Sequence, residues 1–494
     1  MAGKYSLTRK LARHLLWFAV YGTAGVVLTL LVVFVLHLEG RPDLEPWHTA
    51  GLDLEFTAET KLADFREYLA LEDRLFAQLD EQIYRRTGPA ADEPANRYRR
   101  GSAADPQRWS PNWNRSFELA SAAGRPVLLL HGLSDSPYSM RALAQSLHAA
   151  GAHVLALRIP GHGTAPSGLL TVRWQDMAAA VRLAVEHLSA RHAGQAVDIV
   201  GYSNGAALAV QYALAALEDP ELAPVGRLVL LSPEIGVTSA AALAVWQARL
   251  GLLLGLEKLA WNEILPEYDP FKYGSFAVNA ADLSYRITAD IQRRIGELAA
   301  DGRLDAMPPV LAFSPAMDAT VNALALVQNL FDRLPPGDHE LVIYHINHAE
   351  GIEPLLRWSP EPMVQALQHG AGQSYALSVV TNARPGSAEV VERRWRPGAA
   401  GPVEVQLEET WPRDVYSLSH VALPFPPGDP LYGGRPEAPS PGIQLGNLAL
   451  RGERGVLWVS PAAMLRLRWN PFWYYQERRV LEFLGLAGAS GPSD

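Results

Sequence analysis

The sequence contains no cysteine, has no internal repeat and carries few charged residues. Without cysteine there are no disulfides, no thiolate metal sites and no cysteine nucleophile, although the redox compartment stays open. Charged residues make up 19% of the chain and hydrophobic residues 48%, which is a globular composition. The net charge of -9 is spread along the chain, and no basic stripe suggests a nucleic-acid partner.

A long apolar run lies near the N-terminus. From Leu15 to Leu36 no residue carries a formal charge, and this length can cross a bilayer as a helix. Lys4, Arg9, Lys10 and Arg13 precede the run, so we expect residues 1–14 in the cytoplasm. A cleaved signal peptide is the alternative, but its apolar region would be about 7–15 residues, followed by an A-x-A-like site that residues 36–42 lack. We therefore predict a single-pass anchor at 15–36 in a bacterial-type inner membrane, with the remaining chain on the periplasmic or extracytoplasmic side.

Beyond the anchor, the pattern predicts a linker with an amphipathic helix at 37–118, a main domain at 119–486 and a tail at 487–494. Apolar residues recur at helical spacing between residues 56 and 87. Residues 88–118 are rich in Pro, Arg and Asn and are predicted to be irregular.

Strands and helices alternate within the main domain. Short apolar runs predict strands, and longer amphipathic segments between them predict helices. This alternation predicts an α/β fold with a mostly parallel sheet covered by helices on both faces. The predicted strands are residues 127–130, 153–157, 196–200, 227–231, 310–313 and 341–344, and the predicted helices lie near 140–149, 174–191, after Ser203 and at 471–484.

Two insertions interrupt the alternation. A helical, aromatic segment at about 234–307 is predicted to form a cap over the end of the sheet. A β-rich segment at about 371–410 contains alternating stretches at 375–381 and 403–408, which predict an antiparallel excursion. The apolar residues of the cap, among them Trp246, Leu250, Trp261 and Phe271, could line an acyl pocket or form the cap's own core.

The pentapeptide Gly201-Tyr202-Ser203-Asn204-Gly205 is the most informative motif of the chain. It is a G-x-S-x-G sequence between a predicted strand and a predicted Ala-rich helix, the context that supports the motif. At such a turn the serine hydroxyl is exposed at the sheet edge, and the N–H of Asn204 points to the same place. Ser203 is therefore the candidate nucleophile.

A serine nucleophile needs a base, and the base needs a carboxylate to orient it. On this kind of fold the chain order is Ser, then Asp or Glu, then His. Asp318 follows the predicted strand 310–313 and is the candidate acid. His348, just after strand 341–344, has the position that simple topology predicts for the base. His420 lies in a loop with apolar residues and prolines that could hold an imidazole in a dry site, so the residues alone leave both histidines open.

The turn after strand 127–130 reads His131-Gly132-Leu133. Such a turn supplies an N–H aimed at the nucleophile, so the N–H groups of Leu133 and Asn204 are the predicted oxyanion hole. We interpret His131 as structural and not as a base. We interpret His162 as a residue that stabilises its loop, because its segment precedes the nucleophile in the chain.

Together these segments resemble the α/β-hydrolase superfamily, among its serine esterases and monoacylglycerol-lipase-like members. The resemblance rests on HGLSDSP, RIPGHGTAPSGL, GYSNG, the Asp318 loop and SLSHVALPFPPGDPLYG, and it covers about residues 125–350 and 415–484. It implies an α/β-hydrolase fold with Ser203 as nucleophile, Asp318 as acid and, from the SHVALPF segment, His420 as base. The insertion between Asp318 and His420 departs from common esterases and keeps His348 as the second candidate.

We expect a serine hydrolase that cleaves carboxylic esters, lipid-like or acylglycerol esters among them, through an acyl-enzyme. The alternatives are a non-catalytic binding protein on the same fold, or a thioesterase, amidase or acyltransferase with the same triad. No H-E-x-x-H motif occurs and the histidines and carboxylates lack ligand spacing, so we expect no metal and no cofactor. The expected partners are the ester substrate and the membrane, while protein partners stay open.

Overall fold

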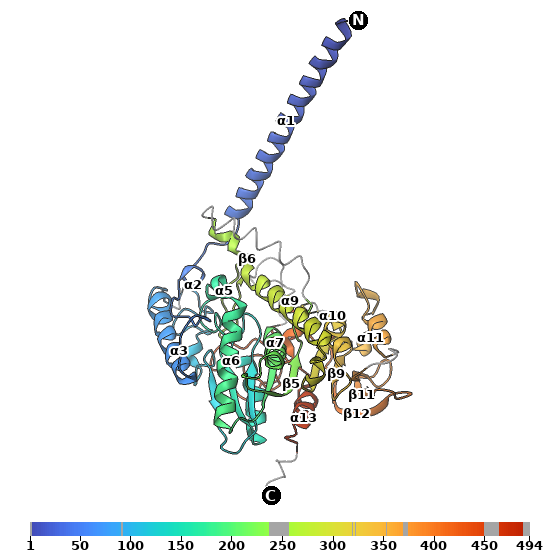
Figure 1. Cartoon of the computed structure of the whole chain (residues 1–494). Helices are drawn as coiled ribbons and strands as arrows, with labels where there is room; N and C mark the ends of the chain where they lie inside the picture. Colours follow the sequence, from blue (N-terminus) through green and yellow to red (C-terminus); the bar gives the residue numbers. More distant parts are fainter. Residues whose placement is uncertain are drawn as a thin grey trace.

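One ten-stranded sheet forms the centre of the protein (Figure 1). The computed structural model describes residues 2–89, 92–236, 256–318, 320–321, 323–351, 353–368, 374–448 and 464–487. In these residues the sheet order is β1 (Phe117–Leu119), β3 (His153–Leu157), β2 (Pro126–Leu130), β4 (Val197–Tyr202), β5 (Val225–Leu231), β8 (Val310–Pro315), β9 (Glu340–Tyr344), β10 (Ala376–Asn382), β11 (Glu389–Trp395) and β12 (Val403–Thr410). Strands β3 to β10 of this order run parallel, which confirms the predicted mostly parallel sheet.

Helices cover both faces of the sheet, as predicted. Alternate residues of β2 belong to different cores: Leu128 and Leu130 pack in one, Val127 and Leu129 in the other. This is the pattern of a strand buried on both sides. The first core holds α6 (Trp174–Arg191), α7 (Asn204–Glu218), α9 (Val278–Ala300), α10 (Ala323–Asn329) and α11 (Glu361–Gln368), and the second holds α4 (Arg141–Ala149) and α13 (Trp473–Phe483).

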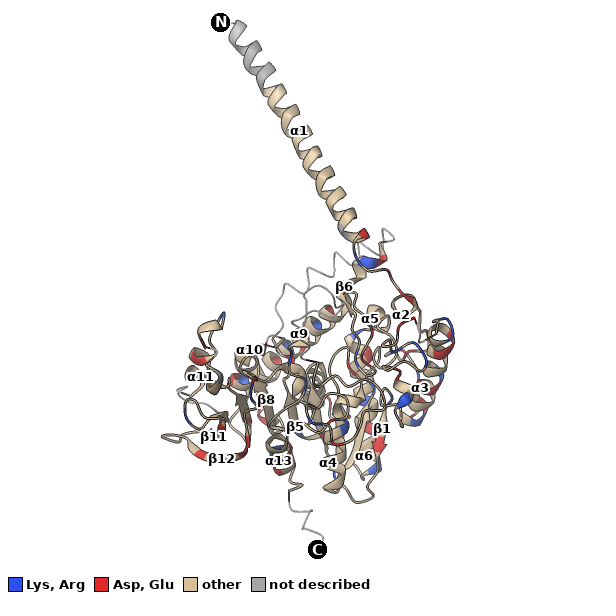
Figure 2. Cartoon of the chain, turned by 180° about the vertical axis from the view of Figure 1, so that it is seen from behind, with Lys and Arg blue, Asp and Glu red and all other residues tan. Residues whose placement is uncertain are grey.

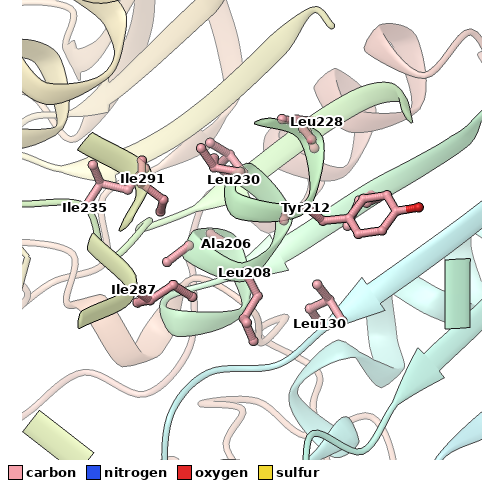
Figure 3. Packing of buried hydrophobic residues seen from close by; sticks show 14 of the residues in the cluster. Leu130, Ala206, Leu208, Tyr212, Leu228, Leu230, Ile235, Ile287 and Ile291 are labelled. Carbon is pink, nitrogen blue, oxygen red and sulfur yellow. The ribbon is translucent and has the colours of Figure 1, made fainter. Parts of the chain in front are cut away.

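Helix α7 is the central helix of the first core (Figure 3). Its side chains Ala206 and Leu208 lie among residues of β5 and α9, including Leu230, Ile287 and Ile291. Residues 204–214 of α7 are all buried. A helix buried on every side must be apolar all round, which explains the Ala-rich run after Ser203. Burial on all sides fixes the start of α7, where the motif serine lies.

The β-rich insertion continues the central sheet. We predicted an antiparallel excursion at about 371–410, but β10 pairs with β9 in parallel and so extends the main sheet. Strands β11 and β12 then follow in antiparallel hairpin order. The sequence analysis missed β11 because its charged residues interrupt the apolar alternation. Residues 371–373, where the predicted insertion begins, lie outside the described part.

The segment before the main domain contains a shorter helix than predicted. Helix α3 spans Phe65–Leu79 and ends in a π-helical turn, Asp80–Tyr84. It begins late in the predicted range 56–87 because the side chain of Asp64 accepts hydrogen bonds from the N–H groups of Arg66 and Glu67. Phe56 lies before the helix, and its ring contacts Tyr68 at 5.2 Å between centroids. The end of the range 88–118, which was predicted to be irregular, belongs to β1. This strand pairs with β3 in antiparallel fashion.

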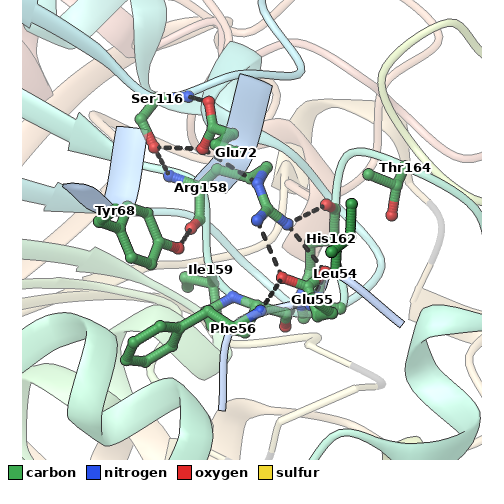
Figure 4. Close-up of polar contacts among 12 residues, drawn as sticks. Leu54, Glu55, Phe56, Tyr68, Glu72, Ser116, Arg158, Ile159, His162 and Thr164 are labelled. Carbon is green, nitrogen blue, oxygen red and sulfur yellow. Dashed lines mark hydrogen bonds and ion pairs between the residues drawn. The ribbon is translucent and has the colours of Figure 1, made fainter. Parts of the chain in front are cut away.

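A buried arginine ties this N-terminal segment to the sheet (Figure 4). Arg158, just after β3, donates to Glu55 at 2.9 and 3.1 Å and to Glu72 of α3 at 3.0 Å. It also donates to the backbone oxygen of His162 at 3.0 Å. Tyr68 donates to the backbone oxygen of Arg158 at 2.7 Å. The charged groups are therefore paired where burial would otherwise penalise them.

Helix α1 (Ala2–Glu39) projects from the body of the protein (Figures 1 and 2). Its stretch Ala12–Leu36 is apolar and long enough to cross a membrane, and it packs against no other part of the described chain. By length and composition this stretch could be a membrane span or a signal sequence. Charged residues lie at its end nearest the body (Figure 2).

The end of α1 is bonded to the cap. The guanidinium of Arg41 donates to the backbone oxygens of Lys258 at 2.6 Å and Trp261 at 2.7 Å. In return, Nζ of Lys258 donates to the backbone oxygen of Arg41 and to Asp43, both at 2.9 Å. Two residues after the helix ends, the chain is thus held against the cap.

The predicted cap is described on both sides of residues 237–255. It contains a 3-10 helix, Glu257–Ala260, a short hairpin of β6 (Trp261–Glu263) and β7 (Phe276–Ala277), and α9. Trp261 and Phe271 are buried in apolar clusters, so these two aromatic residues serve as core. Trp246 and Leu250 lie outside the described residues.

Candidate active site

Ser203 lies at the sharp turn between β4 and α7. Its backbone has φ 54° and ψ -116°, a strained conformation for a residue with a side chain. Hydrogen bonds hold the turn: Ser203 N–H donates to the oxygen of Leu231 at 2.9 Å, and the N–H of Glu234 donates to the oxygen of Ser203 at 3.2 Å. A Cβ on Gly205 would lie 2.3 Å from the oxygen of Leu130, so only glycine allows this close approach.

His420 lies between Ser203 and Asp318. Its Nε2 is 3.0 Å from Oγ of Ser203, and its Nδ1 is 2.8 Å from Oδ2 of Asp318. Because a carboxylate only accepts, Nδ1 of His420 donates to Asp318, and Nε2 is free to accept the hydroxyl proton of Ser203. All three side chains are buried. The structure therefore brings together the three residues that the sequence analysis proposed.

Asp318 follows β8, the strand after which the acid was predicted. Its Oδ1 accepts the N–H groups of Thr320 at 2.8 Å and Val321 at 2.9 Å. Burial alone would raise the pKa of Asp318. The pKa is nevertheless lowered, because the carboxylate is stabilised by the charge and hydrogen bond of His420 and by the two backbone N–H groups. The carboxylate is thus ionised at neutral pH and oriented by the backbone.

The runner-up histidine has other partners. His348 follows β9, as predicted, but its Nδ1 is 2.9 Å from Oε1 of Glu353 and its Nε2 is 3.0 Å from Nδ1 of His345. The structure does not bring His348 to Ser203, because its two ring nitrogens face Glu353 and His345.

The turn proposed for the oxyanion hole lies against the nucleophile. A Cβ on Gly132 would be 3.2 Å from Cβ of Ser203, so the Gly132–Leu133 peptide borders the serine side chain. Ser134 follows with φ 59°, and its oxygen accepts the N–H of Tyr273 from the cap at 2.8 Å. The cap therefore holds the turn that carries the Leu133 N–H.

The two histidines interpreted as structural bond to the backbone. Nε2 of His131 accepts the N–H of Ile159 at 3.1 Å, so its Nδ1 carries the proton and donates to the oxygen of Gly132 at 2.8 Å. Burial and the nearby His162 hold the pKa of His131 well below its usual range. Nδ1 of His162 lies 3.0 Å from the oxygen of Pro160. These contacts stabilise the two turns beside the site.

The sequence analysis missed two acidic residues beside the site. Asp135 is buried two residues after the oxyanion turn's Leu133, and burial raises its pKa to about 6, although Lys272 opposes the shift. Burial also raises the pKa of Glu234. The backbone N–H of this residue donates a hydrogen bond to the backbone oxygen of Ser203. An Asp or Glu in a loop is usually exposed, so nothing in the local pattern signals this burial.

Two cavities are lined by residues of the triad or by a residue next to it in the chain. One has a volume of about 450 Å³ and is lined by Tyr268, Lys272, Val421, Phe425, Arg466 and Arg468. The other has a volume of about 750 Å³ and is lined by Glu234, Asp318, Val321, Leu324, Trp358 and Met363. The larger cavity is lined by Asp318 of the triad, and the smaller one is lined by Val421, the residue after His420 in the chain.

Comparison with known proteins agrees with this architecture. Residues 122–348, just under half of the chain, match the family model of the S33 serine aminopeptidases, which is a hydrolase family. A search of curated proteins found no match. The α/β-hydrolase fold predicted from the sequence is confirmed by the sheet order and by this match.

Solved structures with similarity to this chain include lipolytic enzymes. One is from a study of two metagenome-derived lipolytic enzymes, at 22% identity, covering 47% of this chain and 87% of that one, with a TM-score of 0.35. The monoacylglycerol lipase of Paleococcus ferrophilus has 19% identity, covers 47% and 88%, and has a TM-score of 0.34. A soluble variant of the Saccharomyces cerevisiae monoglyceride lipase has 14% identity, covers 47% and 82%, and has a TM-score of 0.35. At these values the similarities carry no argument about the reaction.

Proposed function

We propose that the protein is a serine hydrolase that cleaves carboxylic esters through an acyl-enzyme on Ser203. The observation that carries the proposal is the position of His420, within hydrogen-bonding distance of both Ser203 Oγ and Asp318 Oδ2. A serine, an imidazole and an ionised carboxylate in this order are the parts that acyl transfer requires.

In the proposed reaction, Oγ of Ser203 attacks the ester carbonyl carbon while Nε2 of His420 takes the hydroxyl proton. The negative charge on the carbonyl oxygen is stabilised by the N–H groups of Leu133 and Asn204. The intermediate expels the alcohol, which receives the proton from His420. Water then attacks the acyl-enzyme, with His420 again as base, and releases the carboxylic acid and free Ser203. Asp318 holds the imidazole and stabilises its charged form.

We propose a lipid-like ester as substrate. The larger cavity, which Asp318 lines, could hold the acyl chain, because it also has apolar side chains from Leu324, Trp358 and Met363. The smaller cavity, lined by Val421, could hold the alcohol part. The apolar α1 supports the same substrate class, because a membrane anchor would keep the site close to lipid. We propose α1 as an uncleaved single-pass anchor with the catalytic domain outside the cytoplasm, since Lys4, Arg9, Lys10 and Arg13 precede it.

The proposal is tested by fluorophosphonate labelling of the full chain in detergent, together with a panel of p-nitrophenyl esters of increasing chain length. Wild type should label and hydrolyse esters, whereas Ser203→Ala should stay folded and lose both properties. The loss in kcat should be on the order of 10³-fold or more. A wild-type chain that is folded but does not label would favour the non-catalytic alternative. Labelling that persists in Ser203→Ala would place the nucleophile elsewhere.

A further inference from the structure

A second cluster of chemically reactive side chains lies outside the proposed triad. His345 and His348 follow β9, and Glu361 is the first residue of α11. One nitrogen or oxygen atom from each of these three residues lies within 4.8 Å of the others. Nε2 of His345 is 3.3 Å from Oε2 of Glu361, and Nδ1 of His345 is 3.0 Å from Nε2 of His348. One side of the cluster is open to solvent: the side chain of His345 is buried, whereas those of His348 and Glu361 are 28% and 47% exposed.

The protons in this cluster do not balance. Three contacts run in a chain: Glu353 with His348, His348 with His345, and His345 with Glu361. Each contact needs one hydrogen, because carboxylates and unprotonated ring nitrogens can only accept. Two neutral imidazoles have two N–H groups between them. One contact is therefore left with two facing acceptors, unless a further proton or a cation lies there.

The geometry points to a zinc site formed by His345, His348 and Glu361, and we propose that the protein binds one zinc ion there. Imidazole nitrogens and a carboxylate oxygen are ligands that zinc accepts, at about 2.0–2.2 Å. The 3.0 Å and 3.3 Å contacts use different ring nitrogens of His345, so a single zinc would take only one of these nitrogens, together with one atom each from His348 and Glu361. Such a set lies within 4.8 Å, and a rotation of the partly exposed Glu361 side chain would bring it to the separation of about 3.3 Å that tetrahedral ligands at about 2.0–2.1 Å from a metal require. A water molecule would complete four-fold coordination from the open side.

Glu353 has the role of an outer partner in this site. Its Oε1 lies 2.9 Å from Nδ1 of His348, so that nitrogen carries the proton and Nε2 presents its lone pair to His345 and Glu361. Carboxylates that orient a ligand histidine in this way are regular partners of metal sites. The sequence analysis expected no metal because it searched for ligand spacing within single motifs. His345 and His348 are an H-x-x-H pair, but Glu361 joins them only through the fold.

The site would brace the loop that leads to His420. Asn347, between the two histidines, donates its side-chain amide to the oxygen of Val415 and its backbone N–H to the oxygen of Tyr416, both at 2.8 Å. A metal that fixes His345 and His348 would also fix Asn347, and with it the chain four residues before His420. The metal is thus structural, and it is absent from the proposed hydrolysis steps.

The test is zinc binding by the full chain in detergent, purified without a polyhistidine tag and stripped with a chelator. The chain has no cysteine, so no thiolate competes for the ion. Calorimetry with zinc chloride should show one ion per chain, and cobalt(II) should give the visible absorption of a tetrahedral site. His348→Gln and Glu361→Gln should each lower the zinc affinity at least about 10-fold, and Glu353→Gln about 10-fold or more. These positions are at least partly exposed, so the variants should fold.

His187→Gln is the matched control. His187 also faces a carboxylate, with Nε2 3.4 Å from Oε2 of Glu118, but it lies on α6 away from the cluster. This variant should bind zinc like the wild type. If the stripped wild-type chain binds no zinc, or if wild type, His348→Gln and Glu361→Gln bind it with equal affinity, the proposal is overturned and a proton is the bridging charge. Because binding is measured directly, this result is independent of whether Ser203 hydrolyses esters.

Discussion

Replacing Asp318 with asparagine should abolish catalysis by reversing the tautomer of His420. Oδ1 of Asp318 accepts two backbone N–H groups, from Thr320 and Val321, and Oδ2 faces Nδ1 of His420. An asparagine must keep its oxygen on the two N–H donors, so its NH₂ group faces Nδ1. That nitrogen then has to accept, and the neutral imidazole carries its proton on Nε2. His420 can no longer take the proton of Ser203.

The expected loss in kcat is on the order of 10⁴-fold, by analogy with the same exchange in other serine triads. At about 1.36 kcal/mol per factor of ten, this corresponds to about 5 kcal/mol of transition-state stabilisation. The assay is p-nitrophenyl ester hydrolysis by the full chain, with circular dichroism to check folding. Asp135→Asn is the matched control, because it changes a buried carboxyl near the site that does not contact His420. A folded Asp318→Asn variant that keeps more than about a tenth of the wild-type kcat would refute the reasoning.

Three further predictions test the base, a buried acid and the brace of the N-terminal segment. His420→Ala should lower kcat about as much as Ser203→Ala, whereas His348→Ala, which leaves the triad intact and at most loosens the brace on the loop before His420, should retain most activity; the opposite outcome would make His348 the base. The pKa of Asp135 is raised to about 6, so Asp135 holds a proton more tightly in the folded protein than in the unfolded chain. The stability that this protonated carboxyl contributes is therefore lost as pH rises from about 4 to about 6. Asp135→Asn should therefore flatten the fall in unfolding free energy across that range in urea titrations, and an unchanged pH dependence would exclude the shift. Arg158→Met leaves the buried Glu72 and the partly buried Glu55 without their cation and should cost about 3–5 kcal/mol in urea unfolding. Arg66→Met at an exposed pair should cost about 0–1 kcal/mol, and equal effects would contradict the role of the buried network.

Local patterns predicted the central sheet well because its strands are buried on both faces. The strand at 153–157 and the helix at 174–191 have the predicted bounds. A fully buried strand is a continuous apolar run bounded by polar residues, so its ends are visible in the sequence. The same patterns predicted too long a helix at 56–87, because Asp64 as N-cap decides where the helix begins. They also missed the parallel pairing of β10 with β9, since pairing between distant strands leaves no local signal.

The candidate site was predictable to a different extent for each residue. The strand–turn–helix context identified Ser203 because the strained turn imposes small residues on both sides. The catalytic histidine could not be chosen from local residues. His348 follows β9, the neighbour of the strand that leads to Asp318, whereas His420 comes only after the three further strands β10, β11 and β12. The loop composition around His420 and the position of His348 pointed in opposite directions, and the resemblance of SHVALPF to a known loop decided for His420. The burial of Asp135 and the approach of Glu361 to His345 depend on tertiary packing, which no motif contains.

The bond between Arg41 and the cap has a kinetic consequence. With α1 spanning a bilayer, as we propose, this junction holds the cap and its cavities at a set height above the lipid surface. The protein then meets its substrate in two dimensions, and turnover should follow the mole fraction of ester in the membrane rather than its amount in the surrounding volume. Loosening the junction with Arg41→Ala would let the domain tilt away from the surface. A dilute substrate in vesicles would then be hydrolysed more slowly, while a soluble ester would be hydrolysed at the original rate.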